Sequence, residues 1–351
     1  MKRNIKALVV DDSALMRKMM TEILSCDEEI EVVGVAANGA IALQKLEHLT
    51  PDIIMLDLQM PVLDGLATLS ALREMERHTP VIIVSSFCER GAQVTLEALE
   101  NGALDYVAKP EVNMKEDFGS LLRSKVKAIC SPSPAKPTDY FVVGPEEIDG
   151  SNVSNEIQLT VIGASTGGPE ALKTFLSALP ADYPTPILVV QHMPEVFTRL
   201  LAERLNKRCA LHVQEAEEGI VAQPGNVYIA PGDFHMTVSR SGERLLLDLN
   251  KDAPIHSCRP AVDPLFCSAT EATKGNVLGV VLTGMGKDGL EGARRIKAAK
   301  GQVLCQDEGS SVVWGMPGVV SQAGLADRTL SLNELAPVVL RLFKESTGES
   351  L

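Results

Sequence analysis

The sequence predicts an α/β protein with two doubly wound parallel-sheet domains. Short apolar runs alternate with segments of helical periodicity along most of the 351 residues, as is typical of parallel strands buried on both faces. The alternation stops between residues 131 and 155, where Pro, Gly, Asp, Ser and Asn accumulate. A chain of this length also favours two hydrophobic cores.

The first half predicts five strand–helix units, a flavodoxin-like (βα)5 domain over residues 1–125. The expected strands are IKALVV, IEVVGVA, DIIMLD, VIIVSS and LDYVAK. The expected helices lie near residues 13–25, 40–48, 66–77, 91–101 and 115–129. We place an interdomain linker over residues 126–155, because the alternating prolines of SPSPAKP favour an extended chain.

A second, Rossmann-like alternation occupies residues 156–351. The expected strands are QLTVIGAS, PILVVQH, NVYIAPGD, VLGVVLTGMG and QVLCQD, with helices near residues 197–205, 290–299 and 332–344. The segment HMTVSRSGERLLLDL predicts a β-hairpin that turns at Ser241-Gly242.

Composition excludes several classes of function. The net charge of −13 argues against binding to nucleic acid or anionic lipid, because such binding neutralises phosphates with basic side chains. Seven cysteines without a C-x-x-C pair indicate reduced thiols. No apolar run is long enough for a signal peptide or a membrane helix. We therefore expect a cytoplasmic protein that does not insert into membranes.

Four charged residues follow strands of the first domain. Asp11 and Asp12 follow the first strand, Asp57 the third and Lys109 the fifth, while Ser85 ends the fourth. The carboxyl ends of parallel strands share one edge of a sheet, so these side chains converge. Converging carboxylates suit Mg²⁺, and one of them could accept a phosphoryl group whose charge the metal and the lysine stabilise. Taken singly, each aspartate could instead be a helix cap.

The motifs VVDDS, LDLQMPVLDG, VSS and DYVAKP resemble the receiver domain of two-component response regulators, over roughly residues 3–125. The resemblance implies that a histidine kinase phosphorylates Asp57. It also implies a Mg²⁺ site at Asp11, Asp12 and Asp57, with the backbone carbonyl of Gln59. The switch residues that it assigns are Ser85, Tyr106 and Lys109.

The turn GASTGG at residues 163–168 follows the first strand of the second domain. Its glycine spacing differs from a dinucleotide-binding loop, and it lacks the Lys-Ser/Thr pair of a P-loop. It fits G-x-S-x-G, a sharp strand-to-helix turn that presents a serine nucleophile, here Ser165. Pro169 is compatible with the first turn of the following helix.

A serine nucleophile needs a base and an acid that orients the base. His192 and Asp288 each follow an expected strand, as Ser165 does, so the three could meet at one edge of the sheet. The order Ser, His, Asp differs from that of α/β hydrolases. Position alone leaves other candidates open, namely His235, His256, Asp233, Asp263 and Asp307.

Five motifs in order, GASTGGPEAL, QHMPEVFTRLLAERL, APGDFHM, CRPAVDPLF and LTGMGKDG, resemble the catalytic domain of chemotaxis protein-glutamate methylesterases, the CheB family. The resemblance implies Ser165 as nucleophile, His192 as general base and acid, and Asp288 orienting the imidazole. It places Thr166 beside the site and the backbone N–H of Met285 at the oxyanion. It implies no cofactor for ester hydrolysis.

The family implies hydrolysis of glutamate methyl esters on chemoreceptors to glutamate and methanol, deamidation of receptor glutamines, and control by phosphorylation of the receiver. We expect a chemotaxis histidine kinase and methyl-accepting chemoreceptors as partners. The alternative is a response regulator whose second domain binds a nucleotide or a protein without catalysis. A DNA-binding output domain fits least, because the second half lacks a basic helix-turn-helix pattern.

Overall fold

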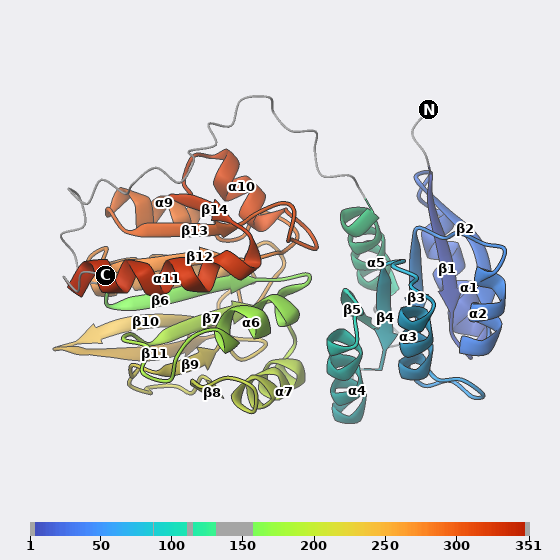
Figure 1. The fold of residues 1–351 in the computed structure, drawn as a ribbon, viewed down its shortest axis with the longest axis horizontal. Helices are drawn as coiled ribbons and strands as arrows, with labels where there is room; N and C mark the ends of the chain where they lie inside the picture. The colour runs from blue at the N-terminus through green and yellow to red at the C-terminus, as the bar shows by residue number, and fades with distance from the viewer. Residues whose placement is uncertain (1–3, 87, 111–114, 131–156, 348–351) are drawn as a thin grey trace. The chain divides into compact units, whose positions relative to one another are not determined.

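The structure, a computed structural model, describes residues 4–86, 88–110, 115–130 and 157–347. Contacts divide the chain into two compact units, Met1–Ser131 and Pro132–Leu351 (Figure 1). Each unit has a parallel sheet with helices on both faces. The predicted fold class is confirmed.

In the first unit the strands pair in parallel in the order β2-β1-β3-β4-β5. Helices α1 and α5 contact each other on one face, and α2, α3 and α4 form a row on the other. The elements in chain order are β1 (Ile5–Val10), α1 (Ala14–Ser25), β2 (Ile30–Ala36), α2 (Gly39–Leu46), β3 (Ile53–Leu56), α3 (Gly65–Glu74), β4 (Val81–Ser85), α4 (Glu89–Glu100), β5 (Asp105–Ala108) and α5 (Lys115–Cys130).

Helix ends in this unit follow local sequence signals. The side chains of Ser13, Asn38 and Asp64 each accept a hydrogen bond from the backbone three residues later, which caps α1, α2 and α3. Helix α5 continues to Cys130, so residues 126–130 are helical and the predicted start of the linker was wrong. The physical reason is that Val126 is fully buried in the hydrophobic core. The rest of the predicted linker lies outside the described residues.

In the second unit seven strands pair in parallel in the order β14-β13-β12-β6-β7-β9-β8, and β10 and β11 form the predicted hairpin as a separate antiparallel pair. The elements in chain order are β6 (Leu159–Ala164), α6 (Gly168–Ser177), β7 (Ile187–Gln191), α7 (Glu195–Asn206), β8 (His212–Glu215), β9 (Asn226–Ile229), β10 (His235–Ser241), β11 (Arg244–Asn250), α8 (Val262–Thr273), β12 (Val277–Val281), α9 (Leu290–Ala298), β13 (Gln302–Gln306), α10 (Met316–Gln322), β14 (Arg328–Leu330) and α11 (Leu332–Thr347).

Two helices in this list, α8 and α10, fall outside the predicted elements, as do the short outer strands β8 and β14. Helix α8 lacks the usual sequence signal for a start, because Ala261 at its N-cap offers no side-chain acceptor. Its first N–H groups are bound instead by a carboxylate more than one element away along the chain. Sequence periodicity does not carry that information.

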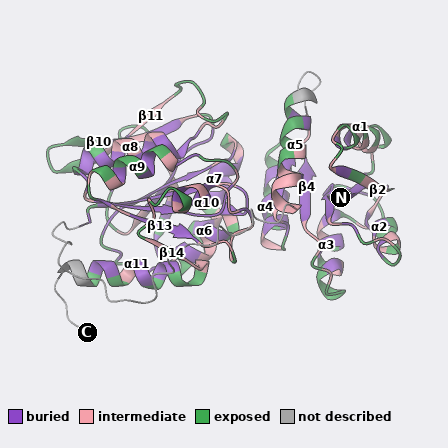
Figure 2. Ribbon diagram, turned by 90° about the horizontal axis from the view of Figure 1, so that it is seen from above, coloured by how far each residue is buried: buried purple, intermediate pink, exposed green. Residues whose placement is uncertain are grey.

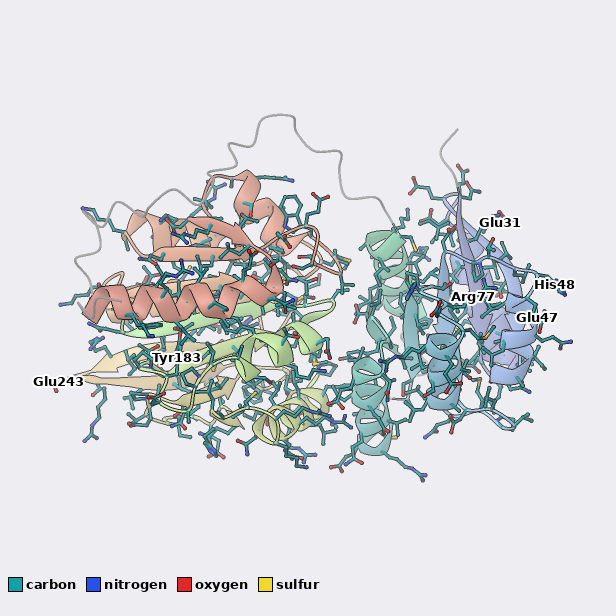
Figure 3. The ribbon with its side chains drawn as sticks, viewed as in Figure 1. Glu31, Glu47, His48, Arg77, Tyr183 and Glu243 are labelled. Carbon is teal, nitrogen blue, oxygen red and sulfur yellow. The ribbon has the colours of Figure 1, made fainter. Side chains whose placement is uncertain are left out.

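Both cores are built on strands that are buried on both faces, and Figure 2 shows the buried residues along the sheets. In the second unit α8, α9, α10 and the hairpin share one core on one face of the sheet. On the other face, α6 contacts both α11 and α7. Tyr183 (labelled in Figure 3) is buried there, where its hydroxyl lies 2.9 Å from Oγ1 of Thr160 and its ring packs edge-on against Phe343 of α11.

Candidate active site

The predicted serine and histidine lie at the carboxyl ends of neighbouring strands. Ala164 of β6 pairs with Gln191 of β7, so Ser165 and His192 are the next residues on these strands. The N–H of His192 donates to the carbonyl of Ala164 at 3.1 Å. On the other side, the N–H of Ser165 donates at 3.0 Å to the carbonyl of Thr283, just after β12. Ser165 is therefore fixed between two parallel strands.

The turn after Ser165 requires glycine. Gly167 has φ +77°, and a Cβ there would lie 2.6 Å from Cγ2 of Val312. A Cβ on Gly168 would lie 1.9 Å from Oε1 of Gln191. The N–H of Gly168 donates to the carbonyl of Ser165 at 2.8 Å and starts α6. This is the tight strand-to-helix turn that G-x-S-x-G predicts, and it leaves Ser165 partly exposed.

Gln191 supports this turn, although no motif pointed to it. It is buried, and its Nε2 donates to the carbonyl of Ser165 at 2.9 Å. The sequence does contain a signal for Gln191, because it is the polar last residue of the otherwise apolar strand β7, ILVVQ. Buried polar side chains are usually hydrogen-bonded for a structural or functional reason.

Asp288 binds His192 and the start of α8 together. Its Oδ2 lies 2.8 Å from Nε2 of His192 and accepts the N–H of Val262 at 2.7 Å. Its Oδ1 accepts the N–H groups of Asp263 at 3.0 Å and Gly289 at 2.9 Å. The N–H groups of Val262 and Asp263 open α8, where the helix dipole favours a negative charge. The carboxylate is thus held by four donors.

This pairing shifts the pKa values of both His192 and Asp288. Burial by itself lowers the pKa of His192, but the hydrogen bond with Asp288 and the nearby sulfur of Cys258 outweigh burial and raise it to about 9. Burial raises the pKa of Asp288, but His192 and the N–H donors of α8 outweigh it, so the pKa stays below its ordinary value. At neutral pH the resting pair is an imidazolium and a carboxylate.

The competing residues have other partners. His235 is buried, and its two ring nitrogens lie 3.2 Å from a backbone carbonyl and from a backbone N–H. Asp233 forms ion pairs with two surface cations, and Asp307 accepts hydrogen bonds from a serine three residues later. Asp263 accepts a backbone N–H of α9 at 2.8 Å. None of these contacts reaches His192.

The ring orientation of His192 decides which nitrogen is available to a nucleophile. Asp288 occupies Nε2, so Nδ1 remains. Among the hydrogen bonds of the described residues, none joins the hydroxyl of Ser165 to this ring. Sγ of Cys258 lies 3.6 Å from Nδ1 instead. Cys258 opens the motif CRPAVDPLF, but the motif alone predicts no role for it, and it lies in a loop far from His192 along the chain.

The predicted oxyanion donor lies in the segment that faces Ser165. A Cβ on Gly284 would lie 2.8 Å from Cβ of Ser165, so the two segments are in close contact. Within the described parts of the chain, the N–H of Met285 donates no hydrogen bond, as an oxyanion donor requires. Thr166 is buried, and its carbonyl accepts a hydrogen bond from Oγ1 of Thr283 at 2.9 Å.

The charged residues of the first unit also converge. Nζ of Lys109 lies 2.8 Å from Oδ2 of Asp11 and 2.8 Å from Oδ2 of Asp57. Carboxylate oxygens of Asp11, Asp12 and Asp57 lie within 4.8 Å of one another. Asp11 and Asp57 are buried, and Asp12 is exposed.

This acidic cluster fits a divalent cation. Burial raises the pKa of Asp57, and Lys109 opposes that rise while Asp11 adds to it. The ammonium group of Lys109 contacts Asp11 and Asp57, and Asp12 adds a third carboxylate to the cluster. Negative charge therefore remains uncompensated on a set of oxygen ligands, which is the donor set that Mg²⁺ prefers.

The remaining predicted receiver residues lie around this cluster. The N–H of Gln59 is 3.4 Å from Oδ1 of Asp57. Ser85 is buried at the end of β4, and its carbonyl accepts the N–H of Lys109 at 2.7 Å. Tyr106 is buried in β5, where burial raises the pKa of its hydroxyl well above the ordinary value.

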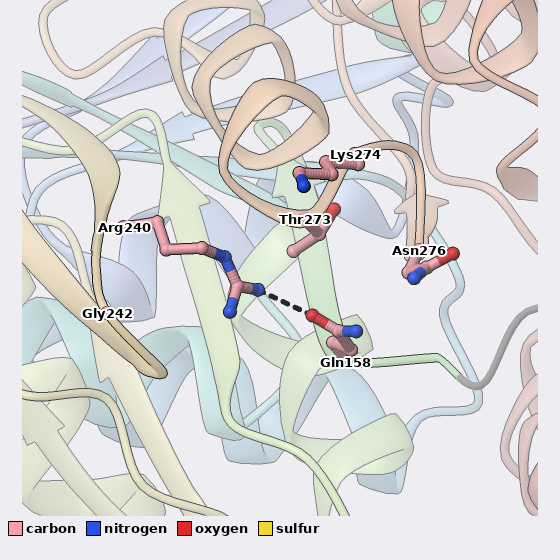
Figure 4. Close-up of a pocket in the computed structure, with 6 residues that line it drawn as sticks. All are labelled: Gln158, Arg240, Gly242, Thr273, Lys274 and Asn276. Carbon is pink, nitrogen blue, oxygen red and sulfur yellow. Dashed lines mark hydrogen bonds between the residues drawn. The ribbon is translucent and has the colours of Figure 1, made fainter.

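A pocket of the second unit lies away from Ser165 (Figure 4). Its lining residues lie just before β6, at the end of α8, just before β12, and around the turn from β10 to β11. Ser165 follows the opposite end of β6. They are Gln158, Arg240, Gly242, Thr273, Lys274 and Asn276. In the described structure, no helix has the length and apolar character needed to cross a membrane.

Comparisons with known proteins match each of the two units to a family. The CheB methylesterase family model matches residues 160–339, and the response regulator receiver domain model matches residues 7–116. A protein-glutamate methylesterase/protein-glutamine glutaminase of Trichodesmium erythraeum is 43% identical over 345 residues, covering 96% of this chain and 98% of that protein. One from Nocardioides sp. is 45% identical over 348 residues, covering 96% and 95%. The crystal structure of the Thermotoga maritima CheB methylesterase catalytic domain aligns with a TM-score of 0.52 at 43% identity, covering 53% of this chain and 98% of that one.

Proposed function

Because the chain belongs to the CheB methylesterase family and carries a receiver domain in front of its methylesterase domain, we propose that it hydrolyses glutamate methyl esters on chemoreceptors under the control of phosphorylation. The products are glutamate and methanol. Deamidation of receptor glutamines follows the same course with ammonia as the leaving group. The observation that carries the proposal is the buried His192–Asp288 pair beside Ser165.

In the proposed reaction Nδ1 of His192 accepts the proton of Ser165, whose Oγ attacks the ester carbonyl carbon. The N–H of Met285 donates to the oxyanion of the tetrahedral intermediate. The imidazolium then protonates the departing methoxide, which leaves as methanol. Water, activated by the same imidazole, hydrolyses the acyl-enzyme. Asp288 stabilises the imidazolium in both halves of the reaction.

Control by the receiver would begin at Asp57, whose carboxylate accepts a phosphoryl group from a histidine kinase. Lys109, at hydrogen-bond distance from Asp57, would neutralise part of the incoming charge. Asp11, Asp12 and Asp57, with the carbonyl of Gln59, are the groups that would hold Mg²⁺. When bound, the ion offsets the negative charge of the phosphoryl oxygens.

The buried pair Ser85 and Tyr106 would respond to the phosphoryl group by repacking. Both lie on strands that border the acidic cluster, and Ser85 shares a backbone hydrogen bond with Lys109. That the response raises esterase turnover is inferred from the order of the two domains. Removal of residues 1–150 should therefore raise basal turnover, and unchanged turnover would contradict the inference.

The decisive measurement is methanol release from membranes that contain methylated chemoreceptors. Wild type and Ser165→Ala are each assayed with and without acetyl phosphate plus Mg²⁺, and Asp57→Asn serves as the control for phosphorylation. We expect release that acetyl phosphate stimulates in wild type, unstimulated release in Asp57→Asn, and no release in Ser165→Ala. Absence of release from phosphorylated wild type would contradict the proposal and would mean that the GASTGG turn is a binding turn or that the substrate is a different one.

A further inference from the structure

The loop before α8 presents a cysteine from a constrained turn. Ile255 and Cys258 exchange two backbone hydrogen bonds of 3.0 and 2.9 Å. His256 and Ser257 between them have φ +51° and +62°. Two consecutive left-handed residues form a two-residue turn of the type I′ kind, which usually takes Asn-Gly. The turn therefore fixes Cys258 at some conformational cost.

Cys258 lies in line with the two residues of the proposed relay. Its Sγ is 3.6 Å from Nδ1 of His192, and Nε2 of the same ring is 2.8 Å from Asp288. A thiol, an imidazole and a carboxylate thus follow one another, as in hydrolases that activate a cysteine. The nitrogen that faces the thiol is the one that Ser165 needs.

We propose that Cys258 is a positioning residue of the esterase site, whose thiol shares Nδ1 of His192 with the hydroxyl of Ser165, and that covalent modification of this thiol stops ester hydrolysis. The proposal rests on the proposed function. The sulfur is partly exposed, so a small reagent can reach it.

The chemistry of modification follows from the contact. At neutral pH the imidazolium of His192 already carries a proton on Nδ1, so it stabilises a thiolate at Cys258 once the thiol has lost its own proton to water. The thiolate is the reactive form of cysteine. With iodoacetamide, the sulfur attacks the methylene carbon, a C–S bond forms, the C–I bond breaks and iodide leaves, while the imidazolium proton stays on His192. The added carbamidomethyl group then occupies the space beside Nδ1 that Ser165 and the ester must share.

Most other cysteines of the described chain are less reactive. Burial raises the pKa of Cys130 and Cys305 to about 12 and that of Cys267 to about 11, and it also raises the pKa of Cys209. Cys26 and Cys88 are the exceptions, because both are exposed in the first unit, and hydrogen bonds from Ser86 and from the backbone also lower the pKa of Cys88. The test therefore uses a Cys26→Ala/Cys88→Ala background, in which these two competing thiols are absent.

In that background the parent chain, Cys258→Ser and Cys209→Ala are treated with iodoacetamide at neutral pH. Methanol release and the labelled peptides, identified by mass spectrometry, are followed together. We expect the parent and Cys209→Ala to lose at least about tenfold in turnover as label appears on Cys258, while treatment leaves the turnover of Cys258→Ser where it started. Equal inactivation of Cys258→Ser, or full labelling of Cys258 with unchanged release, would overturn the proposal.

A second readout separates positioning from a general structural role. The groups that face the His192 ring are Asp288 at Nε2 and Cys258 at Nδ1, with Asp263 and His256 behind Asp288. Cys258→Ala should shift the rising limb of the pH profile of kcat/KM to lower pH. Cys258→Ser should bring the limb part of the way back to its wild-type position. A lower kcat at every pH with an unmoved limb contradicts positioning.

The labelling rate also distinguishes the two proposals. His192→Gln should slow alkylation of Cys258 by about tenfold whether or not the chain is an esterase, because no imidazolium then stabilises the thiolate. Slow alkylation of the variant together with no methanol release from untreated wild type would contradict the proposed function alone. Alkylation at the wild-type rate in His192→Gln would contradict the thiol–imidazole contact.

Discussion

Replacing Asp288 by Asn removes one negative charge and one acceptor atom while keeping the size of the side chain. In the wild-type chain four N–H donors converge on its two oxygens, from Nε2 of His192 and from the backbone of Val262, Asp263 and Gly289. The single oxygen of Asn can accept two of them. Its NH₂ group then faces the other two donors.

The cost to folding follows from these unpaired donors. A buried N–H without an acceptor costs about 1–3 kcal/mol, so two of them lower the free energy of unfolding by about 2–6 kcal/mol. The imidazolium that forms during acyl transfer also loses its counter-charge. The corresponding change in other Ser-His-Asp enzymes lowers kcat by about 10⁴-fold, and we expect about 10³–10⁴-fold here.

Methanol release gives kcat, and urea unfolding gives the stability. Asp263→Asn is the matched control, because Asp263 is also a buried carboxylate at the start of α8 but bonds a backbone N–H of α9 and not His192. It should lose stability with little change in kcat. A folded Asp288→Asn variant with kcat within about tenfold of wild type would refute the role of the carboxylate.

Four further predictions concern the pH dependence of activity, the pH dependence of stability, the receiver and the serine turn. Methanol release should rise about tenfold per pH unit below the raised pKa of His192, about 9, because only the neutral imidazole accepts a proton; a limb centred near 6.5 would contradict this. Folding stability has the opposite pH dependence. The contribution of His192 to the free energy of unfolding is complete below its unfolded-state pKa of 6.5 and is lost as the pH rises through its folded-state pKa of about 9. Urea titrations at several pH values measure this loss. Lys109→Met should abolish stimulation by acetyl phosphate while basal release persists, since Asp57 loses its cation; undiminished stimulation would exclude that role. Gly167→Ala should lower the free energy of unfolding by about 2–4 kcal/mol, because φ is positive and the new Cβ clashes with a methyl group of Val312. Gly219→Ala, where φ is also positive but the space is open, should cost about 1 kcal/mol, and equal losses would show that the clash is relieved.

Much of the candidate site could be predicted because its residues follow strands. Parallel sheets bring strand ends to one edge, so the positions of Ser165, His192 and Asp288 after apolar runs already indicated convergence. Asp11, Asp57 and Lys109 could be grouped for the same reason. The glycines around Ser165 also carry a local signal, because a turn with φ +77° restricts which residues can occupy it.

The alternation of apolar runs with helical segments determined the fold class, the order of the two domains and the residues that had to be considered for chemistry. Tertiary structure decided the rest: that α8 exists and binds Asp288, that Gln191 supports the serine turn, and that Nδ1 of His192 faces Cys258. Backbone periodicity and turn preferences are local, so they can be read along the chain. Side-chain orientation and contacts between distant segments depend on how the core packs, and no short stretch of sequence contains that information.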